Sequence, residues 1–495
     1  IAMPEPMEEE LSQGKNVSLC KECMPLMLTT GTLLKYLKER ENKDEVVLYF
    51  MPETSGPCRF GQYNTFMKTL IEKEKIKDVA VLSLSSDNSY AGLGKRFTIR
   101  TWQGIVADEV LEEIYSNLLV LAKDKDKAMA IYDKAVDKVV ESLSKDSWNQ
   151  VRKVMAKAVK ELSQIETKYH IKDAKKVALV GEIYVRRDSF SKRDLIEKMA
   201  ERDVVVKISP ALEWIHYCDY LIKNKVFSSV TDRDKYQAIV VGWFKNYYEK
   251  AIKNIFGKLD FYEPHIIDVK EVMECSEGLI SEKFTGEAIL TVGASIHEIA
   301  DKVAGVINIG PFGCMPSRIA EAVLNEKLEE RKLEISKDKP HVQRVLSEFE
   351  NLPFMTIEVD GSPFSQLVEA KLESFMLQVD RVHNEMKKDA FLVGYHAPFI
   401  KKLFKPLFNL DDTAFSYAIN ISHSSNTPII ASSTIKQQCL NSPIFTILIS
   451  PGVNIKVVFS SSGTLTSLPT LNTTPSINFG LSVKIIEESD SDLIT

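Results

Sequence analysis

The stretch GVINIGPFGCMPSR, residues 305–318, decides the fold that we expect for this chain. Residues 305–309 form a short apolar run typical of a buried strand, and a Gly/Pro turn follows. A helical pattern begins at Arg318, so Cys314 is predicted to lie in a tight turn between a strand end and a helix start. Open α/β sheets bind their ligands at this place, outside the carboxyl ends of the strands.

The same order of strand, Gly/Pro turn and helix occurs earlier in the chain. Residues 46–50 read as a strand, the turn GPCRFGQY carries Cys58, and a helical pattern covers residues 64–73. Further apolar strands are expected at residues 79–84, 177–184, 204–209 and 354–361. Strands that alternate with helices predict an α/β fold with parallel sheets.

Changes in composition divide the 495 residues into four parts. We expect a first α/β domain at residues 1–103, truncated at its N-terminus because the sequence starts without Met, and a helical segment at residues 104–175. A second α/β domain is expected at residues 176–387. Residues 388–495 are rich in Ser, Thr and Asn and predict a small β-rich appendix, with strands near 445–449 and 455–459, to which no role is assigned.

Residues 211–260 are expected to be mostly helical and rich in aromatic side chains. No basic stripe accompanies these aromatics, so we expect them in the core rather than on a stacking platform for bases. They are Trp214, Tyr217, Trp243, Phe244, Tyr247 and Tyr248.

Composition restricts the partners and the compartment. The net charge is −6, which argues against nucleic acid or an anionic membrane as a partner. No run approaches the ~20 apolar residues of a membrane-spanning helix. Seven cysteines are sparse and odd in number, unlike a secreted disulfide framework, and they predict a reducing, cytoplasmic environment.

Four cysteines lie in Gly/Pro contexts: Cys20 and Cys23 as a C-x-x-C pair, and Cys58 and Cys314 as single residues. Irregular turns leave backbone N–H groups free, and helix N-termini favour a thiolate. Four such thiolates would close a 4Fe-4S cluster, whereas three would leave one iron open. Structural zinc usually takes two closely spaced pairs. The spacing alone therefore leaves a cluster, zinc and no metal as alternatives.

Five motifs carry a resemblance to a known family: SLCKECMPLMLTTG, GPCRFGQY, VALVGEIYVRRDSFS, NIGPFGCMPSRIAEA and PFMTIEVDGSPFSQLVEAKLESF. Together they closely resemble the 2-hydroxyacyl-CoA dehydratase-like (D-component-like) region of large CoA-substrate-specific enzyme activase proteins. The resemblance covers about residues 10–387.

The resemblance implies two flavodoxin-like, Rossmann-like domains with a 4Fe-4S cluster between them. The implied ligands are Cys58, Cys314, and Cys20 or Cys23 or both. It also implies low-potential electron transfer driven by ATP, which a separate actin-like activase module with its own cluster hydrolyses. Neither a G-x-x-x-x-G-K-[ST] loop nor an actin-like phosphate signature occurs in this sequence, so we expect the ATPase module to be a partner, fused upstream or separate.

Other residues within reach of the predicted cluster are candidates for the site. Glu182 ends a strand and is either a proton-transfer group or the ion-pair partner of Arg186, and the ion pair is favoured. Both are named as catalytic candidates. Arg59 and Arg318 flank cysteines and either offset cluster charge or are surface groups, and Gln62 and Tyr63 are candidates for hydrogen bonds to sulfur.

The sequence thus predicts an iron–sulfur protein of the dehydratase/activase type, active in anaerobic metabolism. It would serve as an electron-transfer component or as a dehydratase- or reductase-like component acting on a small or CoA-linked substrate. The alternative is a non-catalytic scaffold that docks an activase ATPase module and holds structural zinc or no metal.

Overall fold

The structure is a computed structural model that describes residues 6–19, 22–54, 56–86, 94–226, 230–266 and 268–394, together with three strands beyond them. The chain divides into two compact units, Ile1–Lys387 and Lys388–Thr495. Within the described residues, no helix combines the length and the apolar character needed to span a bilayer.

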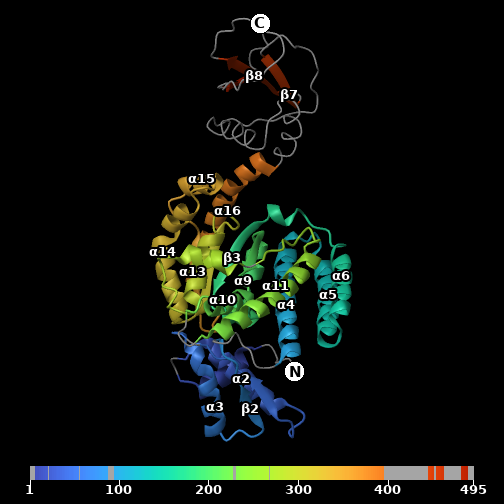
Figure 1. The fold of residues 1–495 in the computed structure, drawn as a ribbon, viewed down its shortest axis with the longest axis vertical. Helices are drawn as coiled ribbons and strands as arrows, with labels where there is room; N and C mark the ends of the chain where they lie inside the picture. The colour runs from blue at the N-terminus through green and yellow to red at the C-terminus, as the bar shows by residue number, and fades with distance from the viewer. Residues whose placement is uncertain are drawn as a thin grey trace. The chain divides into compact units, whose positions relative to one another are not determined.

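A parallel sheet of four strands forms the centre of the first unit (Figure 1). Its strands are β3 (Lys175–Gly181), β4 (Val204–Ile208), β5 (Gly305–Pro311) and β6 (Phe354–Val359). All seven residues of β5 are buried, as expected for a parallel strand covered on both faces. The prediction of an α/β fold with parallel sheets is therefore confirmed.

The strand order is β4-β3-β5-β6, so the chain leaves β3 toward one side of the sheet and continues at β5 on the other. This reversal creates a topological switch point between β3 and β5. In open α/β sheets, a crevice forms outside the carboxyl ends of the strands at such a point. Gly181 and Pro311 end the two strands at this edge.

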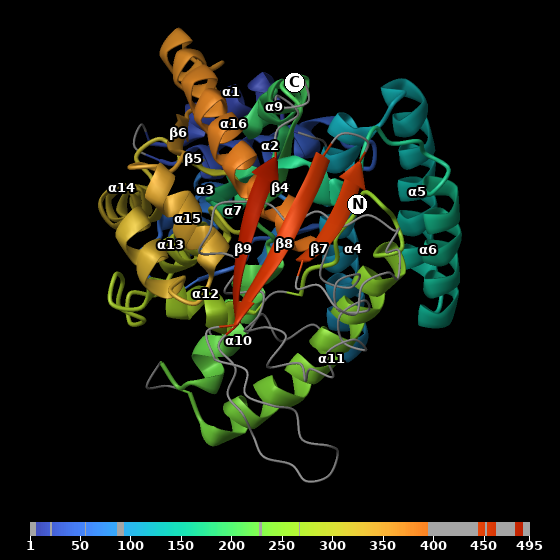
Figure 2. The same cartoon turned by 90° about the horizontal axis from the view of Figure 1, so that it is seen from above.

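Helices connect and cover these strands (Figures 1 and 2). After β3 and β4 come α7 (Ile183–Arg187), α8 (Ser189–Lys192), α9 (Leu195–Glu201), α10 (Leu212–Lys223) and α11 (Asp232–Phe256). Around β5 and β6 lie α12 (Val269–Ser276), α13 (Glu287–Glu298), α14 (Met315–Ile335), α15 (Pro340–Glu348) and α16 (Gln366–Gly394). Except for α11, these helices join their apolar faces to the four strands in one large core.

The first part of the chain contributes a smaller parallel sheet of two strands, β1 (Val47–Phe50) and β2 (Val79–Leu82). The 3-10 helix η1 (Arg59–Gln62) and α3 (Tyr63–Lys73) connect them. The described residues thus supply fewer strands than a doubly wound sheet contains, and Leu48 and Phe50 of β1 are exposed to solvent.

Two helices at the start of the chain cross closely: α1 (Glu8–Val17) and α2 (Met24–Glu39). A Cβ atom on Gly14 or Gly31 would collide with a backbone carbonyl oxygen of the other helix. Glycine is therefore required at this crossing. Because α2 places side chains both in the core of the four-stranded sheet and in that of the two-stranded sheet, it links the two parts.

The helical segment consists of α4 (Lys95–Leu121), α5 (Lys125–Lys145) and α6 (Trp148–Leu162), which share a core with α11. The expectation that the aromatics of residues 211–260 are core residues is only partly right. Tyr217 is fully buried, but Trp243, Phe244 and Tyr247 of α11 are exposed. The physical reason lies in the charged inner face of α11, described below.

The strands of the Lys388–Thr495 unit form an antiparallel sheet in the order β7-β8-β9. They are β7 (Ile444–Ser450), β8 (Val453–Ser461) and β9 (Leu481–Glu488). β7 and β8 include the two strands expected from the sequence, and β9 was not predicted.

Candidate cysteine site at the switch point

Cys314 lies directly beyond the carboxyl end of β5. It is the N-cap residue of α14, and the N–H of Cys314 donates to the carbonyl of Pro311 (3.0 Å) in the tight turn. Gly313 in this turn has a φ of +67°, a conformation that glycine adopts at no steric cost. The turn therefore holds the cysteine at the switch point of the sheet.

Cys58 and Cys23 occupy the equivalent local position in their own segments. Cys58 is the N-cap residue of η1, and Cys23 is the N-cap residue of α2. In all three turns, a backbone N–H of the first helical turn acts on the sulfur and favours its thiolate form. These N–H groups belong to Leu26, Phe60 and Ser317.

Two contacts bring the Cys58 loop against the edge of the four-stranded sheet. Gly56, at a φ of +112°, packs so closely on the loop before α13 that a Cβ there would lie 2.8 Å from the carbonyl oxygen of Thr285. A guanidinium nitrogen of Arg59 donates to the carbonyl oxygen of Gly313 at 3.5 Å. The loop that carries Cys58 thus meets the turn that carries Cys314.

The three thiols are close enough to influence one another electrostatically. Burial raises the pKa of Cys58 to about 12, with additional contributions from the negative charges of Glu287, Glu182 and Cys23. Burial also raises the pKa of Cys314, as do Glu182, Glu287 and Cys58. These surroundings therefore disfavour bare thiolates, and positive charge brought among the sulfurs would stabilise them.

Glu182 follows β3 and caps the short helix α7. Its carboxylate accepts hydrogen bonds from the N–H groups of Tyr184 (3.2 Å) and Val185 (2.8 Å). Burial raises the pKa of Glu182, while the two N–H groups and the charge of Arg186 oppose that rise. Glu182 is thus held in place by backbone groups.

The expected ion pair between Glu182 and Arg186 is not among the ion pairs of the described residues. Arg186 is buried and donates instead to the backbone carbonyls of Gly181, Ser209 (2.9 Å) and Pro210 (3.2 Å). The physical reason is competition, because the N–H groups at the start of α7 need an acceptor and Glu182 supplies it. Arg186 thus links the ends of β3 and β4 through their backbone carbonyls, and we interpret it as a residue that stabilises the fold.

Glu287, the first residue of α13, is a site residue that the sequence reasoning missed. Its carboxylate accepts a hydrogen bond from the N–H of Ile183 (2.9 Å). Burial raises its pKa to about 8, with a further contribution from the charge of Glu182. In the sequence, Gly286 and Glu287 directly precede an apolar helix, and this pattern could have pointed to a buried carboxylate. Acidic residues at helix starts are, however, usually exposed and stabilised by the helix dipole.

Tyr63 is buried, and its hydroxyl makes a hydrogen bond with the Sγ atom of Cys23. Burial and the neighbouring Cys23 thiol raise the pKa of Tyr63 well above its ordinary value, so the hydroxyl is protonated. Gln62, by contrast, is exposed at the start of α3. The structure therefore places Tyr63, but not Gln62, beside a site sulfur.

The two arginines next to the cysteines differ in their surroundings. Arg59 contacts the Cys314 turn, as described above; burial raises the pKa of Cys23, and the positive charge of Arg59 opposes that rise. Arg318 is exposed and forms ion pairs with Glu321 (2.6 Å) and Glu358 (3.6 Å). Arg59 thus acts on the site, whereas the ion pairs of Arg318 belong to the protein surface.

The described cysteines are Cys23, Cys58, Cys218, Cys275 and Cys314, and all are free thiols. Cys20 lies outside the described residues. Among the described residues, no group of three or more His, Cys, Asp and Glu side chains surrounds a point suited to a metal ion.

The donor chemistry nevertheless fits an iron–sulfur group. Thiolates are the ligands that such clusters take, and hydrogen bonds to the sulfurs tune them. Three thiols from separate segments supply the ligands, and a nearby backbone N–H at each helix start favours the thiolate form, although none of these three sulfurs makes an N-cap hydrogen bond. Cys23, Cys58 and Cys314 are the described residues that would hold the group.

The structure is thus an α/β protein with the buried Cys314 at the switch point of its parallel sheet and the half-buried Cys58 on a loop that contacts the Cys314 turn. Comparisons with family models, with curated proteins and with solved structures found no match to this chain.

Proposed function

We propose that this chain is an iron–sulfur protein of the 2-hydroxyacyl-CoA dehydratase/activase type, with a 4Fe-4S cluster held by Cys23, Cys58 and Cys314. Cys20 is the candidate for a fourth ligand. The proposal includes two flavodoxin-like halves, of which the four-stranded sheet would be the second. When bound, such a cluster supplies one-electron transfer at low potential.

The observation that supports the proposal is that three N-cap cysteines from distant parts of the chain share the electrostatic influence of one residue, Glu182. Cys23 is the N-cap residue of α2, Cys58 that of η1 and Cys314 that of α14, and the charge of Glu182 acts on all three sulfurs. Buried cysteines that serve only packing do not need N-cap positions. Iron binding to these thiols would release their protons, so it would be coupled to pH.

The chain's own residues would divide the remaining tasks. The N–H groups of Leu26, Phe60 and Ser317 stabilise charge on the sulfurs. Glu287, with its pKa of about 8, keeps a proton in the neutral range beside the thiols. A protonated carboxyl at this place can donate to a substrate oxygen.

The partners follow from the same proposal. Electrons would come from an actin-like activase module that hydrolyses ATP, fused upstream or separate. A small molecule or a CoA thioester would be the substrate if the chain is a dehydratase- or reductase-like component. We propose that it works in the cytoplasm.

Anaerobic reconstitution of the full chain with iron and sulfide tests the proposal. We expect a broad charge-transfer absorbance, together with iron and acid-labile sulfide in similar amounts. Both should be lost in the Cys58→Ser/Cys314→Ser variant. Cys275→Ser is the matched control, because Cys275 is also a buried free thiol but lies on α12, and it should retain the spectrum.

Two outcomes would contradict the proposal. One is an unchanged spectrum and iron content in the double variant, with circular dichroism showing that it is folded. The other is anaerobically purified protein that contains zinc without sulfide, which would favour the scaffold alternative.

A further inference from the structure

Between Tyr236 and Tyr247, helix α11 carries its large apolar side chains on the outside. Between Asp232 and Phe256, its buried face consists of Ala238, Gly242, Lys245, Glu249, Ile252, Lys253 and Phe256. The exposed fractions of its outer apolar residues are 71% for Tyr236, 42% for Ile239, 40% for Val240, 80% for Trp243, 57% for Phe244 and 53% for Tyr247. With 3.6 residues per turn, these positions lie along one continuous stripe, which we call the α11 stripe.

The inner face of α11 explains why the stripe points outward. Lys245 forms a buried ion pair with Asp219 of α10 (2.8 Å). Glu249 forms an ion pair with Lys253 (2.7 Å) and a hydrogen bond with His216 of α10 (2.9 Å). These contacts fix the charged face toward the protein. An ordinary surface helix has the opposite arrangement, with its apolar stripe facing the core.

The exposed area is large for a single helix. Taking about 200 Å² for a whole aromatic side chain, the four aromatics of the stripe expose roughly 500 Å². With Ile239 and Val240 the stripe reaches about 600 Å², at the upper end of the patches found on monomers. Tyr, Trp and Phe are also the residues enriched at the centres of protein interfaces.

We infer that the α11 stripe is the interface for a second copy of this chain, with the two α11 helices packed antiparallel across a two-fold axis. Two such stripes would together bury about 1,200 Å², the lower end of the range for specific interfaces. A two-fold axis brings the same patch of both copies together. This inference does not depend on the proposed function.

The sequence of the stripe suits pairing with itself. Tyr236, Val240, Trp243 and Tyr247 follow one another at intervals of four, three and four residues, the spacing of a helix–helix seam. No charged residue occurs from Tyr236 to Phe244, so two copies would bring no like charges together at the centre. Figure 2 shows α11 at the periphery of the first unit, beside α4.

Sedimentation velocity of the full chain over a concentration series tests the inference. We expect a dimer, and Trp243→Asp should raise the dissociation constant on the order of 100-fold or more, because a central aromatic is lost from both copies. Leu377→Asp on α16 is the matched control, since Leu377 is 61% exposed outside the stripe, and it should leave the dimer intact.

A photocrosslinker at Tyr236 identifies what covers the stripe. Benzoylphenylalanine at this position should yield a product with the mass of two chains. A crosslink within one chain, to residues 388–495, would overturn the inference, as would a wild-type chain that stays monomeric at every concentration. A dimer that persists in Trp243→Asp would also overturn it, because the interface would then lie elsewhere.

Discussion

Replacing Glu287 with Gln tests the electrostatics of the site directly. The native carboxyl keeps its proton up to a pKa of about 8, because it is buried beside Glu182, whereas its ordinary value is 4.5. The unfolded chain therefore releases this proton at lower pH than the native chain does. Since the native state then binds more protons, the free energy of unfolding falls as pH rises between these two values. Glu287→Gln removes this loss and keeps an acceptor for the N–H of Ile183.

The size of the effect follows from the pKa difference. The interval between 4.5 and about 8 corresponds to an upper limit on the order of 5 kcal/mol, with a slope no steeper than about 1.4 kcal/mol per pH unit. The variant should therefore gain at least about 1 kcal/mol relative to the wild type between pH 5 and pH 8. The buried amide of the Glu287→Gln variant also changes the free energy of unfolding, but by an amount that does not depend on pH. The test is therefore the slope of the free energy of unfolding against pH.

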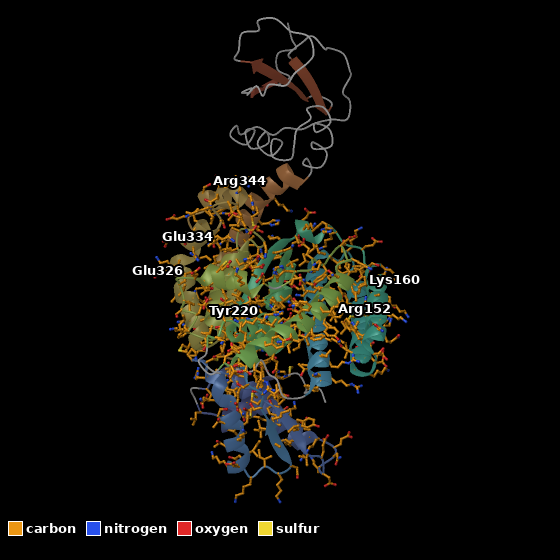
Figure 3. The ribbon with its side chains drawn as sticks, viewed as in Figure 1. Arg152, Lys160, Tyr220, Glu326, Glu334 and Arg344 are labelled. Carbon is orange, nitrogen blue, oxygen red and sulfur yellow. The ribbon has the colours of Figure 1, made fainter. Side chains whose placement is uncertain are left out.

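Urea unfolding of the metal-free chain, followed by circular dichroism at several pH values, measures this slope. Glu326→Gln is the control, because the Glu326 side chain is 76% exposed on α14 (Figure 3). Its stability should follow the wild-type curve at every pH. Parallel curves for Glu287→Gln and the wild type would refute the reasoning, since they would mean that Glu287 is ionised in the native protein.

Three further substitutions test contacts in the first unit, two of them at the cysteine site and one between α10 and α11. Gly181→Ala should destabilise the chain by about 3 kcal/mol in urea unfolding, because φ is +107° and a Cβ would collide with a backbone oxygen of β5; an unchanged midpoint would contradict this. Tyr63→Phe removes the hydroxyl bonded to Cys23 and should cost about 1 kcal/mol in thermal unfolding of the metal-free chain, whereas a gain would contradict the contact. Lys245→Ala removes the buried charge opposite Asp219 and should cost about 3–5 kcal/mol, while Lys245→Met/Asp219→Leu should cost less; equal costs would argue against the pair.

The fold could be predicted from the sequence where the local pattern is unambiguous. Val177–Val180 and Val306–Ile309 are nearly continuous apolar runs because parallel strands are covered on both faces. The strand order could not be predicted, because it depends on pairing between segments far apart in the chain. The orientation of α11 was also beyond local reasoning, since both of its faces have helical spacing and the choice depends on contacts with Asp219 and His216.

The site was predictable to the extent that it is built from turns. Cys58 and Cys314 lie in Gly/Pro turns before helices, and the sequence singles them out for that reason. Glu287 was missed because an acidic helix start normally faces solvent, and here the loop bearing Gly56 covers that end of α13. The role of Glu182 was misjudged because the nearest cation in sequence, Arg186, bonds to backbone carbonyls instead.

The geometry of the site has a local and a non-local origin. The same Cys-Met-Pro sequence starts two helices, at Cys23-Met24-Pro25 and at Cys314-Met315-Pro316. In each, cysteine is the N-cap residue, and proline lies in the first turn, where the backbone N–H that it lacks would have no partner within the helix. Each such sequence places one cysteine at the start of its own helix but does not determine the distance between the sulfurs. That distance depends on long-range contacts such as the one between Arg59 and Gly313. Short sequence motifs therefore determine the local surroundings of each thiol. Whether the three thiols can bind one group depends on the contacts that hold the two sheets together.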